Sequence, residues 1–134
     1  MVQMDPPFNT EEAKNFVEKT GVDALAIAIG TAHGFYKQEP ELQLDLLSQI
    51  SEITKASLVL HGGSGIPGNQ LQAAISRGIC KVNLATEIKN IFMKSLQIEL
   101  KNNDEIDLRK VFPKATAEIT KLVKEKIEIV KNNK

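Results

Sequence analysis

Residues 58–67 read Leu-Val-Leu-His-Gly-Gly-Ser-Gly-Ile-Pro, a short apolar run that ends at a histidine and continues as a glycine-rich turn. A short apolar run that leads into turn residues is typical of a strand covered on both faces in a parallel sheet. We therefore expect residues 57–60 to form a buried strand with polar groups at its carboxyl end. In α/β proteins this is the end of the sheet at which ligands bind.

The sequence on either side of this strand alternates between β and α patterns. Further strands are expected at Ala24–Ile29, which is apolar throughout, and at Lys81–Ala85. Helices are predicted between and after the strands from the 3.6-residue spacing of apolar side chains. The resulting order (helix, strand, helix, strand, helix, strand, helix, helix) predicts an α/β fold with a parallel sheet and right-handed crossovers. The first predicted helix runs from a capping box at Asn9 and Glu12 to Gly21, and the second from about Glu41 to Thr54. The third runs from about Asn69 to Arg77 with a C-cap at Gly78. The fourth begins at Glu87 with Thr86 as its cap, and a last helix contains Leu122 and Val130.

Composition excludes several classes of protein. The chain has 134 residues with 17 basic and 17 acidic side chains, so it lacks the positive charge that sequence-independent nucleic-acid binding needs. The longest apolar run, Ala24–Ile29, is far too short to span a membrane. A single cysteine cannot form an internal disulfide, and the first ten residues do not resemble a signal peptide, so we expect a cytoplasmic protein.

The chemically useful side chains follow the three predicted strands. Both histidines of the chain, His33 and His61, are placed at that edge, where a metal-binding role and a structural role are about equally supported. The glycines after His61 would let backbone N–H groups approach an oxyanion, with the Ser64 hydroxyl as a further donor. Thr86 would lie at a helix start, which attracts phosphate. A plain turn that needs positive φ explains the glycines equally well, and neither a Walker loop nor a dinucleotide fingerprint is present.

Three segments carry a resemblance to a known family. Residues 21–34 (GVDALAIAIGTAHG), 58–67 (LVLHGGSGIP) and 81–87 (KVNLATE) resemble the class II, zinc-dependent fructose/tagatose-bisphosphate aldolases. The resemblance implies the C-terminal part of a (β/α)8 TIM barrel, namely its last three βα units and terminal helices. Residues 1–134 would then be one partial domain, with the N-terminal half of the barrel absent.

The resemblance also implies roles for individual residues. The reaction would be reversible, zinc-assisted cleavage of fructose- or tagatose-1,6-bisphosphate to dihydroxyacetone phosphate and glyceraldehyde 3-phosphate. His33 and His61 match zinc ligands, and a monovalent cation near the phosphate is a further possible cofactor. The residues that match the segments holding dihydroxyacetone phosphate are Gly34, Gly62, Gly63, Ser64, Asn83, Leu84, Ala85 and Thr86.

Parts of the family's catalytic site have no counterpart in this sequence. The third zinc histidine, its neighbouring aspartate and the glutamate base all belong to the family's N-terminal half, so this chain holds no catalytic residue and is expected to be inactive alone. Cys80 is expected to be an inert core thiol, and Glu87 to stabilise its helix rather than bind metal. Tyr36 and Lys37 are either loop surface or a contact to substrate.

Other functions remain open at this point. The chain could be a non-catalytic module that binds a phosphorylated sugar, or a subunit that self-associates or completes a barrel with an N-terminal half. A decayed gene product with neither zinc nor phosphate affinity is the third alternative. The choice between fructose and tagatose bisphosphate depends on groups outside the matching segments.

Overall fold

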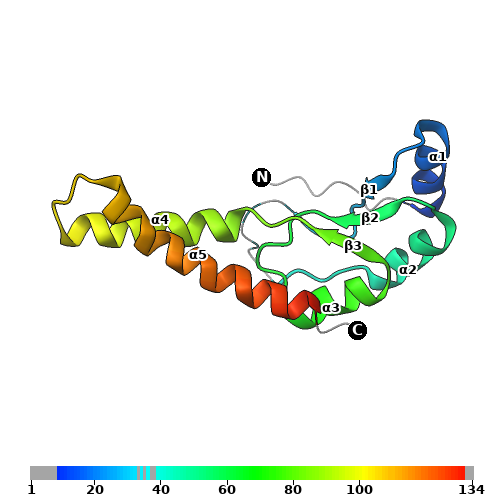
Figure 1. Cartoon of the computed structure of the whole chain (residues 1–134). Helices are drawn as coiled ribbons and strands as arrows, with labels where there is room; N and C mark the ends of the chain where they lie inside the picture. The colour runs from blue at the N-terminus through cyan, green and yellow to red at the C-terminus, as the bar shows by residue number, and fades with distance from the viewer. Residues whose placement is uncertain (1–8, 33, 35, 37–38, 132–134) are drawn as a thin grey trace.

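The computed structural model describes residues 9–32, 34, 36 and 39–131. Its elements follow the predicted order along the chain (Figure 1). They are α1 (Thr10–Thr20), β1 (Ala24–Ala26), α2 (Leu44–Ile53), β2 (Ser57–Leu60), α3 (Gly68–Ser76), β3 (Ile79–Val82), α4 (Thr86–Asn102) and α5 (Leu108–Lys131).

The three strands form one parallel sheet in the order β1-β2-β3. Leu25 pairs with Leu58, which in turn pairs with Ile79, and the register shifts between Leu58 and Val59. The α/β prediction is therefore confirmed. Right after these strands the chain turns into the loops that carry the predicted site, so the parallel arrangement brings those loops to one edge.

The hydrophobic core lies between the sheet and the helices. It contains strand residues together with residues of α1, α2 and α3, and Ile129 of α5 packs against it. The opposite face of the sheet is exposed at Ala24, Ala26 and Lys81. The apolar run of β1 is typical of a strand covered on both faces, but Ala24 and Ala26 are exposed, so among the described residues β1 is covered on one face only. The central core residues are Leu25, Ile27, Leu47, Ile50, Leu58, Leu60, Leu71 and Ile79.

Several boundaries differ from the predictions. β1 ends at Ala26 rather than Ile29, because only its three residues pair with β2. β3 begins at Ile79 and includes Cys80. The Cys80 side chain is exposed, so the prediction that its thiol lies in the core is wrong. The capping box of α1 is confirmed, since the Glu12 N–H donates to Asn9 Oδ1 over 2.8 Å.

Helices α4 and α5 form a long antiparallel hairpin that extends away from the sheet (Figure 1). Phe92 and Phe112 contact each other edge to face across it, with ring centroids 5.7 Å apart. The far end of α5 returns to α3, where the Gln72 side chain donates to the Ile129 carbonyl over 3.2 Å. No helix within the described ranges combines the length and the apolar character needed to cross a membrane.

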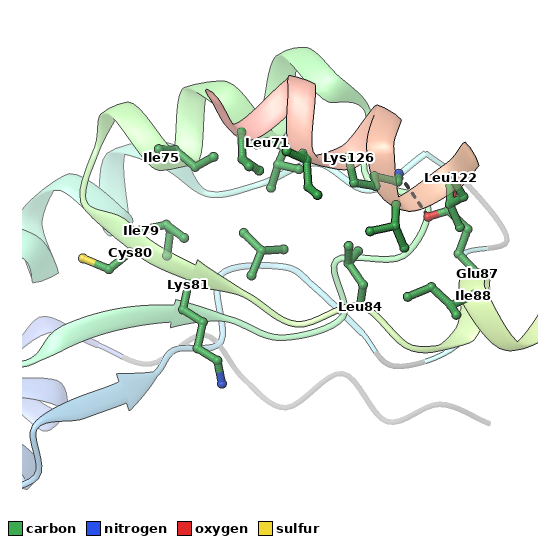
Figure 2. A pocket seen from close by; sticks show the side chains of 14 residues that line it. Leu71, Ile75, Ile79, Cys80, Lys81, Leu84, Glu87, Ile88, Leu122 and Lys126 are labelled. Carbon is green, nitrogen blue, oxygen red and sulfur yellow. Dashed lines mark ion pairs between the residues drawn. The ribbon is translucent and has the colours of Figure 1, made fainter. Parts of the chain in front are cut away.

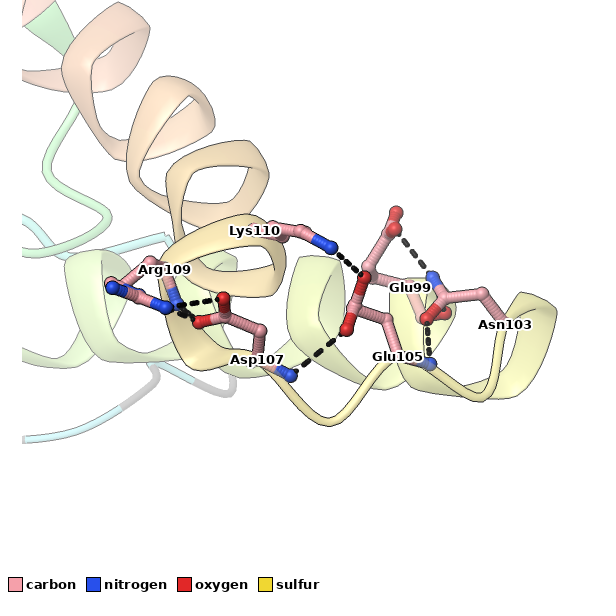
Figure 3. A network of polar contacts seen from close by, with 6 residues as sticks. All are labelled: Glu99, Asn103, Glu105, Asp107, Arg109 and Lys110. Carbon is pink, nitrogen blue, oxygen red and sulfur yellow. Dashed lines mark hydrogen bonds and ion pairs between the residues drawn. The ribbon is translucent and has the colours of Figure 1, made fainter.

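A polar network closes the turn of this hairpin (Figure 3). Asp107 accepts a hydrogen bond from the Arg109 backbone N–H over 3.0 Å, and its Oδ2 lies 2.9 Å from Arg109 Nη2. Lys110 Nζ donates to Glu105 over 2.8 Å. The hydrogen bond with Arg109 lowers the pKa of Asp107, and the one with Lys110 lowers the pKa of Glu105. Both carboxylates, when ionised, therefore stabilise the folded turn.

Candidate functional site

A small pocket lies at the carboxyl ends of β2 and β3. Its volume is about 210 Å³, and it combines residues from three separate loops. These loops converge because parallel strands end at the same edge of a sheet. The lining residues are Gly34, His61, Gly62, Ser64, Asn83, Ala85 and Thr86, all of which were singled out from the sequence.

Two other predicted site residues, Gly63 and Leu84, lie outside this pocket. Gly63 is buried within the glycine-rich loop that follows β2. Leu84 lines a second, apolar pocket of about 440 Å³ between β3, α3, α4 and α5 (Figure 2). His33, the other predicted zinc ligand, lies outside the described residues. The structure thus brings together seven of the ten predicted positions in one pocket.

The loop at residues 62–65 (Gly-Gly-Ser-Gly), which we call the glycine loop, packs directly on the end of β3. The Gly63 N–H donates to the Asn83 carbonyl over 3.0 Å. A Cβ on Gly63 would lie 2.6 Å from Val82 Cγ1, and a Cβ on Gly62, whose φ is +64°, would collide with the Ala32 carbonyl. Glycine is therefore required here both by close packing and by a left-handed backbone.

Ser64 is the polar side chain that joins this loop to α4. Its side chain is only 4% exposed, and its Oγ accepts from the Ala85 N–H over 3.3 Å and from the Glu87 N–H over 3.2 Å. With two N–H donors on the oxygen, the Ser64 hydroxyl proton is left to donate to another group. The helix start thus receives its cap from a distant loop.

The expected cap at Thr86 is wrong. Helix α4 begins at Thr86 itself, with Ala85 in the N-cap position and no side-chain cap from that residue. The helix starts one residue earlier than predicted, so the N-cap is Ala85, which has no side-chain acceptor, and Ser64 Oγ accepts from the Glu87 N–H in its place. Thr86 still lines the pocket, so its predicted place beside a ligand is compatible with this geometry.

Asn83 and His61 contact each other across the pocket. Asn83 Nδ2 lies 3.2 Å from His61 Nε2, and both side chains are partly buried. The two residues come from the ends of β3 and β2, so the sheet fixes their separation. The contact orients the imidazole, and it couples the amide to any group that the ring binds.

Tyr36 has a structural contact that the sequence did not reveal. Its hydroxyl accepts from the Ala32 N–H over 3.0 Å and donates to the Gly62 carbonyl over 2.9 Å. Burial raises the pKa of Tyr36, so the hydroxyl stays protonated and able to donate. Tyr36 thus joins the loop after β1 to the glycine loop, whereas its neighbour Lys37 lies outside the described residues.

A complete metal centre is not formed by the described part of the chain. No group of three or more His, Cys, Asp or Glu side chains with suitable positions occurs there. A catalytic zinc normally takes three protein ligands. Of the two histidines in the sequence, only His61 belongs to the described residues.

Comparison with known proteins gives a consistent result. The family model for fructose-bisphosphate aldolase class-II matches residues 8–134. The YdjI aldolase from Escherichia coli K12 is 33% identical, with a TM-score of 0.79 over 92% of this chain and 46% of that protein. A putative fructose-1,6-biphosphate aldolase from Coccidioides immitis (23% identity, TM-score 0.77, 93% and 43% coverage) has the same fold.

A fructose-bisphosphate aldolase from Campylobacter jejuni also has this fold. It is 21% identical, with a TM-score of 0.75 over 93% of this chain and 45% of that protein. This chain therefore spans less than half the length of the solved structures that it matches.

Proposed function

This chain belongs to the class II fructose-bisphosphate aldolase family, and from that premise we propose that its pocket binds the phosphate-bearing half of a ketose bisphosphate. The observation that carries the proposal is the convergence of Gly62, Ser64, Asn83 and Thr86 around one pocket of about 210 Å³. Family membership makes the corresponding whole enzyme a lyase of carbohydrate metabolism. The ligand proposed for this chain is dihydroxyacetone phosphate.

Each polar group has a distinct task in this proposal. The Ser64 hydroxyl proton and the helix start at Thr86, both of which line the pocket, would receive the phosphate oxygens. The Asn83 amide would hydrogen-bond the ketose part, because it lies beside His61 at the carboxyl end of the sheet. Binding at the phosphate orients the reacting carbons without taking part in the bond change.

Zinc would supply Lewis-acid polarisation of the ketone in the complete enzyme. We propose that His61 and His33 are two of its ligands and that the third comes from outside this chain. The contact between Asn83 and His61 Nε2 would help to hold the imidazole in place for such a metal. A monovalent cation beside the phosphate is a further proposed component.

We propose that the three-stranded sheet is the C-terminal part of a (β/α)8 barrel and that this chain alone does not cleave fructose or tagatose bisphosphate. The exposed side chains of Ala24, Ala26 and Lys81 on one face of the sheet support this proposal, because the interior face of a barrel is normally filled by side chains of the other strands. The partner would be a second chain that supplies the N-terminal half, or another copy of this one. A cytoplasmic location fits such a metabolic enzyme.

The central test is ligand binding by the purified 134-residue chain. We expect dihydroxyacetone phosphate and inorganic phosphate to shift the backbone amide NMR signals of Gly62, Ser64 and Thr86 in a saturable manner. Glycerol lacks the phosphate and serves as the matched control, for which no shifts are expected. Titration without any change at these amides would refute the proposed function.

A second experiment tests the need for a partner. A coupled assay with fructose and tagatose 1,6-bisphosphate and added zinc should show no turnover by this chain alone. Activity should appear after addition of the N-terminal half of a class II aldolase, together with a mixed oligomer in a solution mass measurement. Binding of the phosphate ligand without any complementation would favour a non-catalytic binding module, and robust turnover by the chain alone would refute the inactivity.

A further inference from the structure

The carboxylate of Glu87 joins three elements in the apolar pocket of Figure 2, next to the loop and helix start that line the phosphate pocket. Glu87 lies in the first turn of α4, and its Oε2 accepts from the Gly65 N–H of the glycine loop over 3.4 Å. The same oxygen lies 3.0 Å from Lys126 Nζ on α5 (Figure 2). One carboxylate oxygen therefore connects the glycine loop, the start of α4 and the C-terminal helix.

This ion pair is unusually well shielded for this protein. The Lys126 side chain is 14% exposed and that of Glu87 25%, whereas Lys121, which pairs with Glu118 on the same helix, is 68% exposed. A shielded pair is screened less by solvent and salt than an exposed one. Its charges therefore influence the neighbouring pocket more strongly than those of the surface pairs.

The charges have opposite consequences for an anion in the pocket. The start of α4 favours a phosphate, but an uncompensated carboxylate in its first turn repels one. Lys126 neutralises that carboxylate. Glu87 meanwhile accepts from the Gly65 N–H, which belongs to the peptide that follows Ser64.

We propose that Lys126 and Glu87 are positioning residues for the phosphate pocket, with Lys126 cancelling the charge of Glu87 while Glu87 holds the glycine loop in its binding geometry. This inference rests on the proposed function and adds to it a contribution from α5. Because Lys126 belongs to the helix that also contacts α3, the binding geometry depends on the docking of the C-terminal helix.

The test compares the affinity for inorganic phosphate among variants of the full chain. Lys126→Met should weaken phosphate binding about three- to tenfold, the effect of one uncompensated unit charge nearby. Lys126→Arg should restore affinity to within about twofold, because it keeps the charge. The double variant Glu87→Gln/Lys126→Met should bind more tightly than Lys126→Met, because the repelling carboxylate is gone.

The matched control is Lys121→Met, which removes an exposed lysine from the same helix and should leave phosphate affinity unchanged. A purely structural role of the pair predicts instead that the double variant binds no better than Lys126→Met. Unchanged phosphate affinity in Lys126→Met, or no recovery in the double variant, would overturn the inference.

Failure of the proposed function gives a different result, namely no phosphate binding by the unsubstituted chain. The hydrogen-exchange rate of the Gly65 amide then tests, without any ligand, the hydrogen bond between the Gly65 N–H and Glu87. Faster exchange in Glu87→Ala, which removes the oxygen that accepts from the Gly65 N–H, would support a positioning role for this carboxylate. Exchange that is the same in both proteins would overturn that role on its own.

Discussion

Replacement of Ser64 by alanine tests the junction between the glycine loop and α4. The substitution is close to isosteric, so it removes the Oγ acceptor without leaving a large cavity. The Ala85 and Glu87 N–H groups would then lose their partner. Loss of a helix cap typically costs about 1 kcal/mol, and an unsatisfied buried donor adds about 1 kcal/mol or more.

We therefore expect Ser64→Ala to lower the free energy of unfolding by about 2 kcal/mol, measured by urea denaturation with circular dichroism. The thermal midpoint should fall by roughly 6–10 °C for a chain of this size. Thr86→Ala is the matched control, because this residue begins the same helix without capping it. Its unfolding free energy should stay within about 0.5 kcal/mol of that of the unsubstituted chain. A loss in Thr86→Ala as large as that in Ser64→Ala would refute the assignment of the cap.

Three further predictions concern the loops and the hairpin. Tyr36→Phe should lower the unfolding free energy by about 1–2 kcal/mol in urea, because two hydrogen bonds are lost; a change below about 0.5 kcal/mol would contradict the link to Gly62. Gly62→Ala should lower the unfolding free energy by about 2 kcal/mol or more in the same assay. Gly21→Ala, at a residue with a similar φ but open space around it, should lower it by about 1 kcal/mol. Equal losses in the two variants would show that the contact with Ala32 is unimportant. The lowered pKa values of Glu105 and Asp107 imply that their stabilisation is complete above the ordinary values of 4.5 and 3.8 and disappears as pH falls through the folded-state values. The variant Glu105→Gln/Asp107→Asn should therefore lose less unfolding free energy than the unsubstituted chain between pH 7 and pH 3, and identical pH profiles would argue against the network.

The sequence alone was sufficient to predict the element order and most of the pocket. Apolar runs placed the strands, and the rule that parallel strands end at one edge placed His61, Ser64 and Asn83 together. Both predictions depend on local patterns, namely the spacing of apolar residues and the residues that directly follow each strand. Zinc binding at His33 and His61 stays a prediction, since the first of these lies outside the described residues.

Contacts between distant residues were decided only by the tertiary structure. The cap of α4 comes from Ser64 rather than Thr86, and Lys126 in the C-terminal part of α5 pairs with Glu87 at the start of α4. Local spacing cannot predict such pairs, because they depend on how helices pack after the strands are paired. The exposed face of the sheet has the same origin: the apolar pattern of β1 matches a strand covered on both sides, but whether a second layer exists depends on what else packs there.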